Sequence, residues 1–253
     1  MARKPIIIFV SASVGVVMLF LAYLGVWAVT HPFSGGMQGA FRDLAPRARP
    51  EDSTLQARKQ DLKLKLGAFL DEALPNDIFS FYAESFVDDC QRGQYNFKVK
   101  SDYLDRCFLS IARVYGFDGD FRERMIGLER GIVYQGWQPT QVWRKERFEP
   151  ADMEYYMLNY YDYRPSSLTV NRVPSPRYEY QNELSLLIDW LEQEPTHSPW
   201  VERLSHEGGQ GVNSQWKKID AEIFKETLKK HKYLLILMAS GNYFESHMWE
   251  FLR

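Results

Sequence analysis

Residues 103–137 read YLDRCFLSIARVYGFDGDFRERMIGLERGIVYQGW, and they contain the clearest strand and helix patterns in the chain. Apolar residues alternate over residues 107–115, which is typical of a β-strand. One of the two aspartates in residues 118–120 can then cap a helix start with its side-chain oxygen. One face of that helix carries four apolar residues, Phe121, Met125, Leu128 and Ile132. Gly136 tolerates positive φ and Trp137 can fold back on the last turn, so the pattern predicts a Schellman-type helix end.

Three other segments have the apolar spacing of amphipathic helices, namely residues 53–73, 180–191 and 219–228. The first begins after the acidic residues Glu51 and Asp52, which favour a helix start through capping and the helix dipole. Residues 76–87 are rich in Phe, and their pattern leaves helix and strand both open.

The C-terminal region predicts a β-hairpin. Residues 233–239 are a continuous apolar run, Gly241-Asn242 resembles a two-residue turn, and apolar positions alternate again as far as Phe251. An arm that is apolar on both faces is expected at the centre of a sheet. Residues 167–173 predict a further strand. Together these patterns predict an α+β fold, with a mostly antiparallel sheet and helices packed on one face, preceded by one N-terminal transmembrane helix.

An uncharged run extends from Ile6 to Val29 and follows Arg3 and Lys4. At 1.5 Å per residue, these roughly 24 residues reach about 36 Å, enough to cross a hydrocarbon core. Trp27 lies near the distal end, as an interfacial aromatic anchor would. The run exceeds the apolar region of a signal peptide and lacks a small-residue cleavage pattern. We therefore expect an uncleaved anchor that contacts membrane lipid through residues 6–29.

The chain is expected to divide into four segments. Residues 1–5 form a short cytoplasmic segment, residues 6–29 a transmembrane helix, residues 30–52 a flexible linker rich in Pro and Gly, and residues 53–253 a single extracytoplasmic α+β domain. The net charge is only −2 and basic residues are scattered, so the sequence predicts no nucleic-acid partner.

Cys90 and Cys107 are the only two cysteines, and both lie outside the predicted anchor. An even count in a membrane-anchored chain favours a disulfide in an oxidising compartment. Two free buried thiols in a reducing compartment are the alternative. With the positive residues before the anchor, the pair predicts a cytoplasmic N-terminus and a C-terminal domain that is periplasmic or on the cell surface.

No catalytic motif stands out in the sequence, and we predict no cofactor. Weak binding candidates are Tyr156 and Tyr160 in a tyrosine-rich segment, and His206 and Glu207 in a Gly-rich loop. Tyrosines at this density are more often core or rim residues than a stacking platform. His206-Glu207 lacks the second histidine that a zinc protease needs.

Acidic residues also invite a metal or acid–base interpretation. Asp118 and Asp120 lack further ligands at calcium-loop spacing, so helix capping explains them better than a metal site. Glu84, Asp88 and Asp89 could in principle supply paired carboxylates, although acidic residues beside a turn are usually solvated. We therefore predict neither a metal site nor a catalytic residue here.

The leading hypothesis is a single-pass, membrane-anchored extracytoplasmic domain that binds another protein without catalysis, as an accessory or assembly factor or an immunity-type inhibitor. An anchor, a tether and a compact domain without catalytic signatures favour it. One alternative is an extracytoplasmic hydrolase with an unrecognised site. Another is a small-ligand sensor that uses the tyrosine-rich segment.

Overall fold

The computed structural model describes Tyr23 and residues 52–74, 77–94, 101–144, 147–156, 175–192, 199–205 and 215–247. The chain divides into two compact units. Unit 1 comprises Met1–Ala48, Arg92–Arg106 and Glu245–Arg253, and unit 2 comprises Arg49–Gln91 and Cys107–Phe244.

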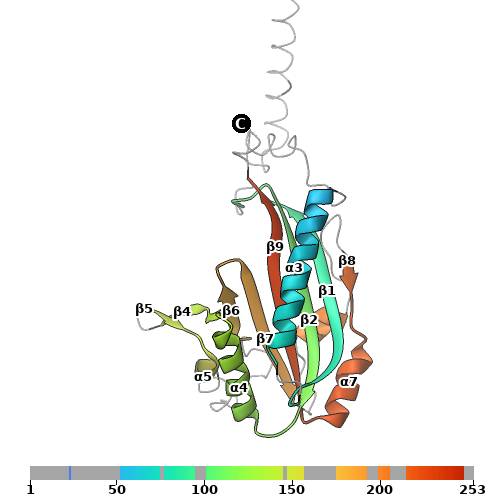
Figure 1. Cartoon of the computed structure of the whole chain (residues 1–253), viewed down its shortest axis with the longest axis vertical. Helices are drawn as coiled ribbons and strands as arrows, with labels where there is room; N and C mark the ends of the chain where they lie inside the picture. Colours follow the sequence, from blue (N-terminus) through green and yellow to red (C-terminus); the bar gives the residue numbers. More distant parts are fainter. Residues whose placement is uncertain are drawn as a thin grey trace, which may run out of the picture. The chain divides into compact units, whose positions relative to one another are not determined.

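Seven strands form one sheet in the order β3-β6-β7-β9-β2-β1-β8 (Figure 1). Their bounds are β1 Ser80–Arg92, β2 Asp105–Phe117, β3 Gln138–Pro139, β6 Arg177–Tyr180, β7 Leu184–Glu192, β8 Gln215–Lys217 and β9 Tyr233–Ser246. A separate two-stranded sheet contains β4 (Gln141–Arg144) and β5 (Arg147–Pro150). The helices are α3 Ser53–Glu72, α4 Phe121–Tyr134, α5 Met153–Tyr156, α6 Pro199–Ser205 and α7 Ala221–Lys230.

The predicted α+β class with a mostly antiparallel sheet is confirmed. Antiparallel pairing joins β3 with β6, β6 with β7, β7 with β9, and β1 with β8. Residues 76–87, which the sequence left open between helix and strand, contain the start of β1.

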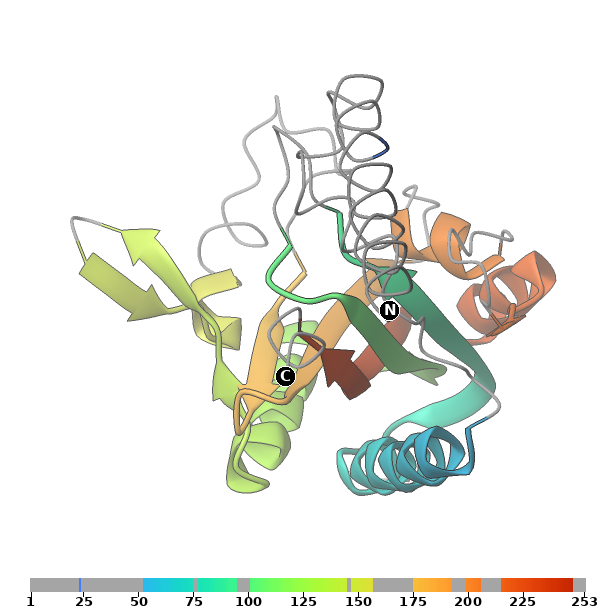
Figure 2. The same ribbon diagram turned by 90° about the horizontal axis from the view of Figure 1, so that it is seen from above.

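Helices cover both faces of the sheet, which corrects the prediction that they pack on one face. Successive residues of β9 point to opposite faces. The Tyr233 ring lies 5.0 Å from that of Phe121 in α4. Leu234 instead shares a buried cluster with Leu204 of α6 and Phe224 of α7. Figure 2 shows α3 and α4 on one side of the sheet and α6 and α7 on the other. Because the central strand β9 has apolar residues at both odd and even positions, other elements must cover both faces of the sheet.

Residues 180–191 form a turn and a strand, so the amphipathic helix predicted there is wrong. Gln181 and Asn182 both have positive φ, at 53° and 58°. The Glu183 N–H donates to the Tyr180 carbonyl at 3.1 Å and closes the turn. Four apolar residues have helical spacing by sequence, Leu184, Leu187, Ile188 and Leu191. A strand that is buried on both faces has apolar residues at odd and at even positions, so it can show the same three- and four-residue spacing as a helix.

Strand β9 continues through Gly241 and Asn242, so the predicted C-terminal hairpin is also wrong. Gly241 pairs with Leu184 of β7. A Cβ at Gly241 would lie 2.6 Å from Leu184 Cδ2 and 3.2 Å from Leu62 Cδ1 of α3. The glycine therefore allows close packing rather than a turn. The expected central position is confirmed, since β9 is the fourth of seven strands.

Two predicted helix starts and one helix end are confirmed. Asp52 caps α3 by accepting the Thr54 N–H at 2.7 Å, and Asp120 caps α4 by accepting the Glu123 N–H at 2.8 Å. Gly136 follows α4 with φ at 93°. These local contacts fix where both helices begin and where α4 ends.

Among the described residues, no helix combines the length and the apolar character that crossing a membrane requires. Apart from Tyr23, the predicted anchor at residues 6–29 lies outside the described residues. The same is true of the predicted strand at residues 167–173 and of the predicted linker at residues 30–52, except for Asp52.

Candidate functional site

The outward side of α4 exposes a stripe of residues at helical spacing. We define the α4 outer face as Glu123, Gly127, Arg130, Val133 and Tyr134, all of which are exposed. Tyr134 is 93% exposed and Val133 is 46% exposed. Aromatic side chains are usually at least half-buried. Tyr134 is almost fully solvated, so its ring adds no buried apolar surface to the core.

Gly127 lies at the middle of this face. A glycine inside a helix costs about 1 kcal/mol relative to alanine. A Cβ at Gly127 would meet no atom within 4 Å, whereas one at Gly131 would approach the Ala73 carbonyl oxygen at 3.4 Å. Packing within the described part of the domain therefore does not require glycine at position 127, and the bare backbone there is open to a close approach from outside.

The buried side of α4 is held by Glu129. Its Oε1 accepts the Met153 N–H at 2.8 Å and the Tyr178 hydroxyl at 2.7 Å. Burial raises the pKa of Glu129 above its ordinary value of 4.5, although both hydrogen bonds act in the opposite direction. Glu129 thus fixes α4 against α5 and β6, and this fixes the direction of the outer face.

The β4–β5 hairpin begins beside the same elements. The Thr140 N–H donates to the Arg177 carbonyl at 2.9 Å, and the Ala151 N–H donates to the Thr140 carbonyl at 2.9 Å. Figure 2 shows the hairpin projecting to the left, beyond the edge of the seven-stranded sheet that β3 and β6 form. These hydrogen bonds tie the base of the hairpin to β6.

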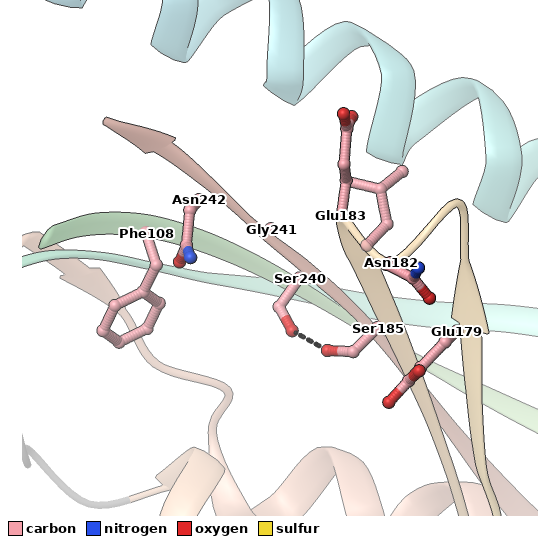
Figure 3. Close-up of a pocket in the computed structure, with 9 residues that line it drawn as sticks. Phe108, Glu179, Asn182, Glu183, Ser185, Ser240, Gly241 and Asn242 are labelled. Carbon is pink, nitrogen blue, oxygen red and sulfur yellow. Dashed lines mark hydrogen bonds between the residues drawn. The ribbon is translucent and has the colours of Figure 1, made fainter. Parts of the chain in front are cut away.

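A polar pocket of about 270 Å³ lies on the sheet at the β6–β7 turn. Glu179 of β6 pairs across the ladder with Ser185 of β7, which pairs in turn with Ser240 of β9. The two serine Oγ atoms are 2.7 Å apart. Phe108 and Asn242 line the same pocket (Figure 3). Cross-strand partners share a face, so Glu179, Ser185 and Ser240 form one row. Figure 3 shows Asn242 and Phe108 continuing this row onto β2.

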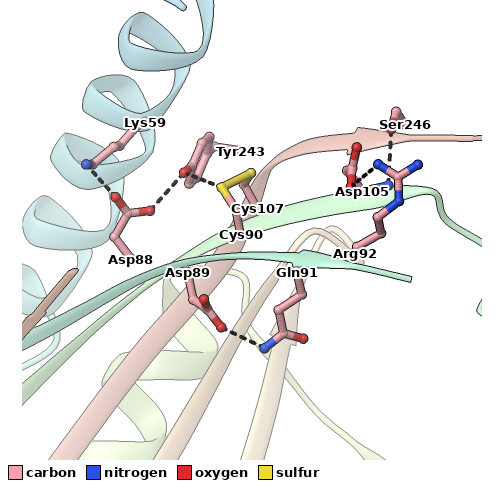
Figure 4. Close-up of a disulfide and its surroundings, with 10 residues drawn as sticks. All are labelled: Lys59, Asp88, Asp89, Cys90, Gln91, Arg92, Asp105, Cys107, Tyr243 and Ser246. Atoms are coloured by element: carbon pink, nitrogen blue, oxygen red, sulfur yellow. Dashed lines mark hydrogen bonds and ion pairs between the residues drawn. A yellow bond between two sulfur atoms is a disulfide. The ribbon is translucent and has the colours of Figure 1, made fainter. Parts of the chain in front are cut away.

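Cys90 and Cys107 are joined by a disulfide between the neighbouring strands β1 and β2, as predicted. A buried polar network lies beside it (Figure 4). The Tyr243 hydroxyl donates to Asp88 at 2.8 Å and lies 3.3 Å from Cys90 Sγ, and Lys59 of α3 forms an ion pair with Asp88. Burial, followed by the hydrogen bond to Asp88, raises the pKa of Tyr243.

The acidic residues near this disulfide form no carboxylate pair. Asp88 and Asp89 are successive residues of β1 and point to opposite faces. Asp89 accepts the Gln91 amide at 2.7 Å, and Glu84 accepts Arg113 Nε at 2.8 Å. Each of these carboxylates has its own structural partner.

A second polar cluster joins three segments that are distant in sequence. His231 contacts Asp118 Oδ2 through Nδ1 at 2.7 Å and the Tyr82 hydroxyl through Nε2 at 3.0 Å. Asp118 also accepts the Lys232 N–H at 2.8 Å, and this bond, with the His231 bond, lowers the pKa of Asp118. The imidazole packs against Gly116, where a Cβ would lie 2.2 Å from its Cδ2. No sequence pattern pointed to this cluster, because His231 is more than 100 positions from both Asp118 and Tyr82.

Unit 1 contains its own polar cluster around Arg106. Its Nε donates to Glu245 at 2.7 Å, its guanidinium lies 3.5 Å from Asp102, and it stacks 3.9 Å from the Tyr103 ring centroid. The hydrogen bond to Glu245 raises the pKa of Arg106. These contacts join the described parts of unit 1 by charge and stacking.

Of the four binding candidates from the sequence, the structure describes only Tyr156. Its side chain is 5% exposed, so it is a buried residue of α5 rather than part of an open stacking platform. Tyr160, His206 and Glu207 lie outside the described residues. Within the described ranges, no three His, Cys, Asp or Glu side chains converge as metal ligands.

Comparisons of the chain with protein-family models, with curated proteins and with solved structures find no match.

Proposed function

We propose that this chain is a single-pass, membrane-anchored extracytoplasmic domain that binds another protein through the α4 outer face, without catalysis. The observation that carries the proposal is Tyr134, which is 93% exposed beside the exposed Val133. Tyrosine is among the residues that most often supply binding energy at protein interfaces.

The backbone at Gly127 supports a protein partner. Helices approach one another closely where a small residue leaves room for the facing backbone, and Gly127 has open space where a side chain would be. Arg130 lies between Gly127 and Tyr134 on the same stripe and can form a hydrogen-bonded rim. A partner helix or strand placed over Gly127 would bury the side chains of Val133 and Tyr134.

Two features support the location. The uncharged run at residues 6–29 has the length of a membrane span, and the positive residues before it favour a cytoplasmic N-terminus. The Cys90–Cys107 disulfide is consistent with a periplasmic or cell-surface domain, because disulfides persist mainly in oxidising compartments. In this proposal, membrane lipid contacts residues 6–29 and the protein partner contacts α4.

Site-specific photocrosslinking in native membranes tests the proposal. A photoreactive residue replaces Arg130 on the outer face, and a matched variant carries it at Glu226, an exposed position of α7. We expect one discrete protein adduct from position 130 and none from position 226. Equal labelling from both positions, or no adduct from position 130, would contradict the proposal.

A further inference from the structure

We propose that the polar row beside the β6–β7 turn binds a neutral saccharide. The row consists of Glu179, Ser185, Ser240, Asn242 and Phe108. It is separate from the α4 outer face, so it does not depend on the protein partner proposed above.

The row occupies the sheet face that α6 and α7 cover elsewhere. Leu234 and Ile236 of β9 are buried in the cluster under those helices. Ser240 and Asn242 have the same parity on β9 and therefore point to the same face. Along this face, β9 changes from apolar residues up to Met238 to the polar Ser240 and Asn242, and the described residues that line the pocket come from the sheet and the β6–β7 turn. Ser240 is partly exposed and Asn242 is exposed, so the row is accessible in the described structure.

The chemistry of the row suits hydroxyl groups. A sugar hydroxyl both donates and accepts hydrogen bonds. Glu179 offers a carboxylate acceptor, Asn242 offers a donor and an acceptor on one amide, and each serine hydroxyl can do either. Figure 3 shows these side chains following one another from Glu179 to Phe108, so they can meet successive hydroxyls of one ring.

Phe108 supplies the apolar side of the site. It stands at the end of the row opposite Glu179 (Figure 3) and is only partly buried. The face of an aromatic ring carries partial negative charge and attracts the slightly positive C–H groups on one side of a pyranose. The volume of about 270 Å³ is below that of pockets for drug-sized ligands, roughly 300–1,000 Å³, and therefore suits a single sugar ring.

The charges favour a neutral ligand over a polyamine. Of the two carboxylates that line the pocket, Glu183 points toward α3 (Figure 3). The pKa of Lys65 in α3 is raised mainly by its hydrogen bond to Asp61, and the charge of Glu183 adds to this. Only Glu179 faces the serine pair. A polyamine carries only donors, so it could pair with Glu179 but would leave the Asn242 amide N–H without an acceptor. An anion would be repelled by the Glu179 carboxylate.

Saturation-transfer difference NMR on the full chain tests this site. The protein is held in lipid nanodiscs, because glycosidic detergents would compete. The probes are neutral trisaccharides built from glucose, N-acetylglucosamine, mannose or galactose, with spermidine as the charged alternative. We expect saturation transfer to the ring protons of at least one trisaccharide. Glu179→Ala and Ser240→Ala should each weaken that binding by about tenfold or more, since hydrogen bonds to a ligand are lost.

The matched control is Glu226→Ala, which removes an exposed carboxylate on α7 and should leave the signal unchanged. Glu179 is exposed, so its variant should keep the folded state, which thermal unfolding of the same samples checks. Three results would overturn the proposal: no signal from any trisaccharide, a saccharide signal that both row variants retain, or binding of spermidine in preference to every saccharide.

Discussion

The hydroxyl of Tyr243 on β9 donates a 2.8 Å hydrogen bond to Asp88 on β1, and both residues are buried. Strand β2 lies between these two strands in the sheet. The bond therefore spans the strand that carries Cys107, beside the disulfide that joins Cys107 to Cys90. A hydrogen bond and a covalent bond thus link the same three strands at one place.

Tyr243→Phe should lower the free energy of unfolding by about 1–3 kcal/mol, because a buried carboxylate loses a hydrogen-bond donor. Thermal unfolding of the full chain in nanodiscs, followed by tryptophan fluorescence, measures the change. Tyr134→Phe is the control, since its exposed hydroxyl should contribute nothing to folding. Equal stability of Tyr243→Phe and the parent protein would mean that the buried hydrogen bond contributes nothing to the free energy of unfolding.

Replacing both Cys90 and Cys107 by alanine should cost roughly 3 kcal/mol, as expected for a cross-link that closes a short loop in the unfolded chain. The two cysteines are 17 residues apart, so the loop that the disulfide closes is short. In membranes from the native source, neither thiol should react with a maleimide until a reductant is added. Labelling without a reductant would remove the support that the disulfide gives to an extracytoplasmic location.

Two glycine substitutions should have opposite effects on stability. Gly127→Ala should raise the free energy of unfolding by about 0.5–1 kcal/mol, because alanine favours the helix and its Cβ meets open space. Gly241→Ala should lower it by roughly 1–3 kcal/mol, because the added Cβ overlaps Leu184. Paired unfolding curves check both signs, and a loss of stability in Gly127→Ala would show that position 127 is packed.

Glu129 should make stability depend on pH. Its pKa is raised in the folded state, so the folded state binds the proton more tightly than the unfolded state does. The contribution of Glu129 to stability is therefore greatest below its ordinary pKa of 4.5 and declines as the pH rises through the raised value.

The matched variant for this effect is Glu129→Gln, whose amide oxygen can still accept from Met153 and Tyr178. Between pH 7 and pH 4, the parent protein should gain melting temperature relative to the variant. A difference that is independent of pH, or one that changes in the opposite direction, would refute the assignment.

Local signals in the sequence predicted several elements correctly. The caps at Asp52 and Asp120, the stop at Gly136, the alternation in β2 and the pairing of the two cysteines each depend on short-range chemistry. The predictions that failed depended on tertiary context. The apolar spacing in residues 180–191 fits both a helix and a doubly buried strand, and Gly241 is read as a turn unless Leu184 is known to lie beside it.

The candidate sites were beyond reach of the sequence for a related reason. The polar row combines Phe108, Glu179, Ser185 and Ser240, which become neighbours only through the register of four strands. The helical spacing places Tyr134 opposite the apolar stripe of α4, but whether another element covers that side depends on the tertiary fold, so the α4 outer face becomes visible only when exposure is known.

The most direct measurement of the central claim is the affinity of the full chain in nanodiscs for the protein that crosslinks at position 130. Tyr134→Ala should weaken this affinity by at least about tenfold, because it removes the exposed aromatic side chain that carries the proposed interface. Its melting temperature should stay within a few degrees of the parent value, since Tyr134 is 93% exposed. An unchanged affinity in a folded Tyr134→Ala variant would contradict the account.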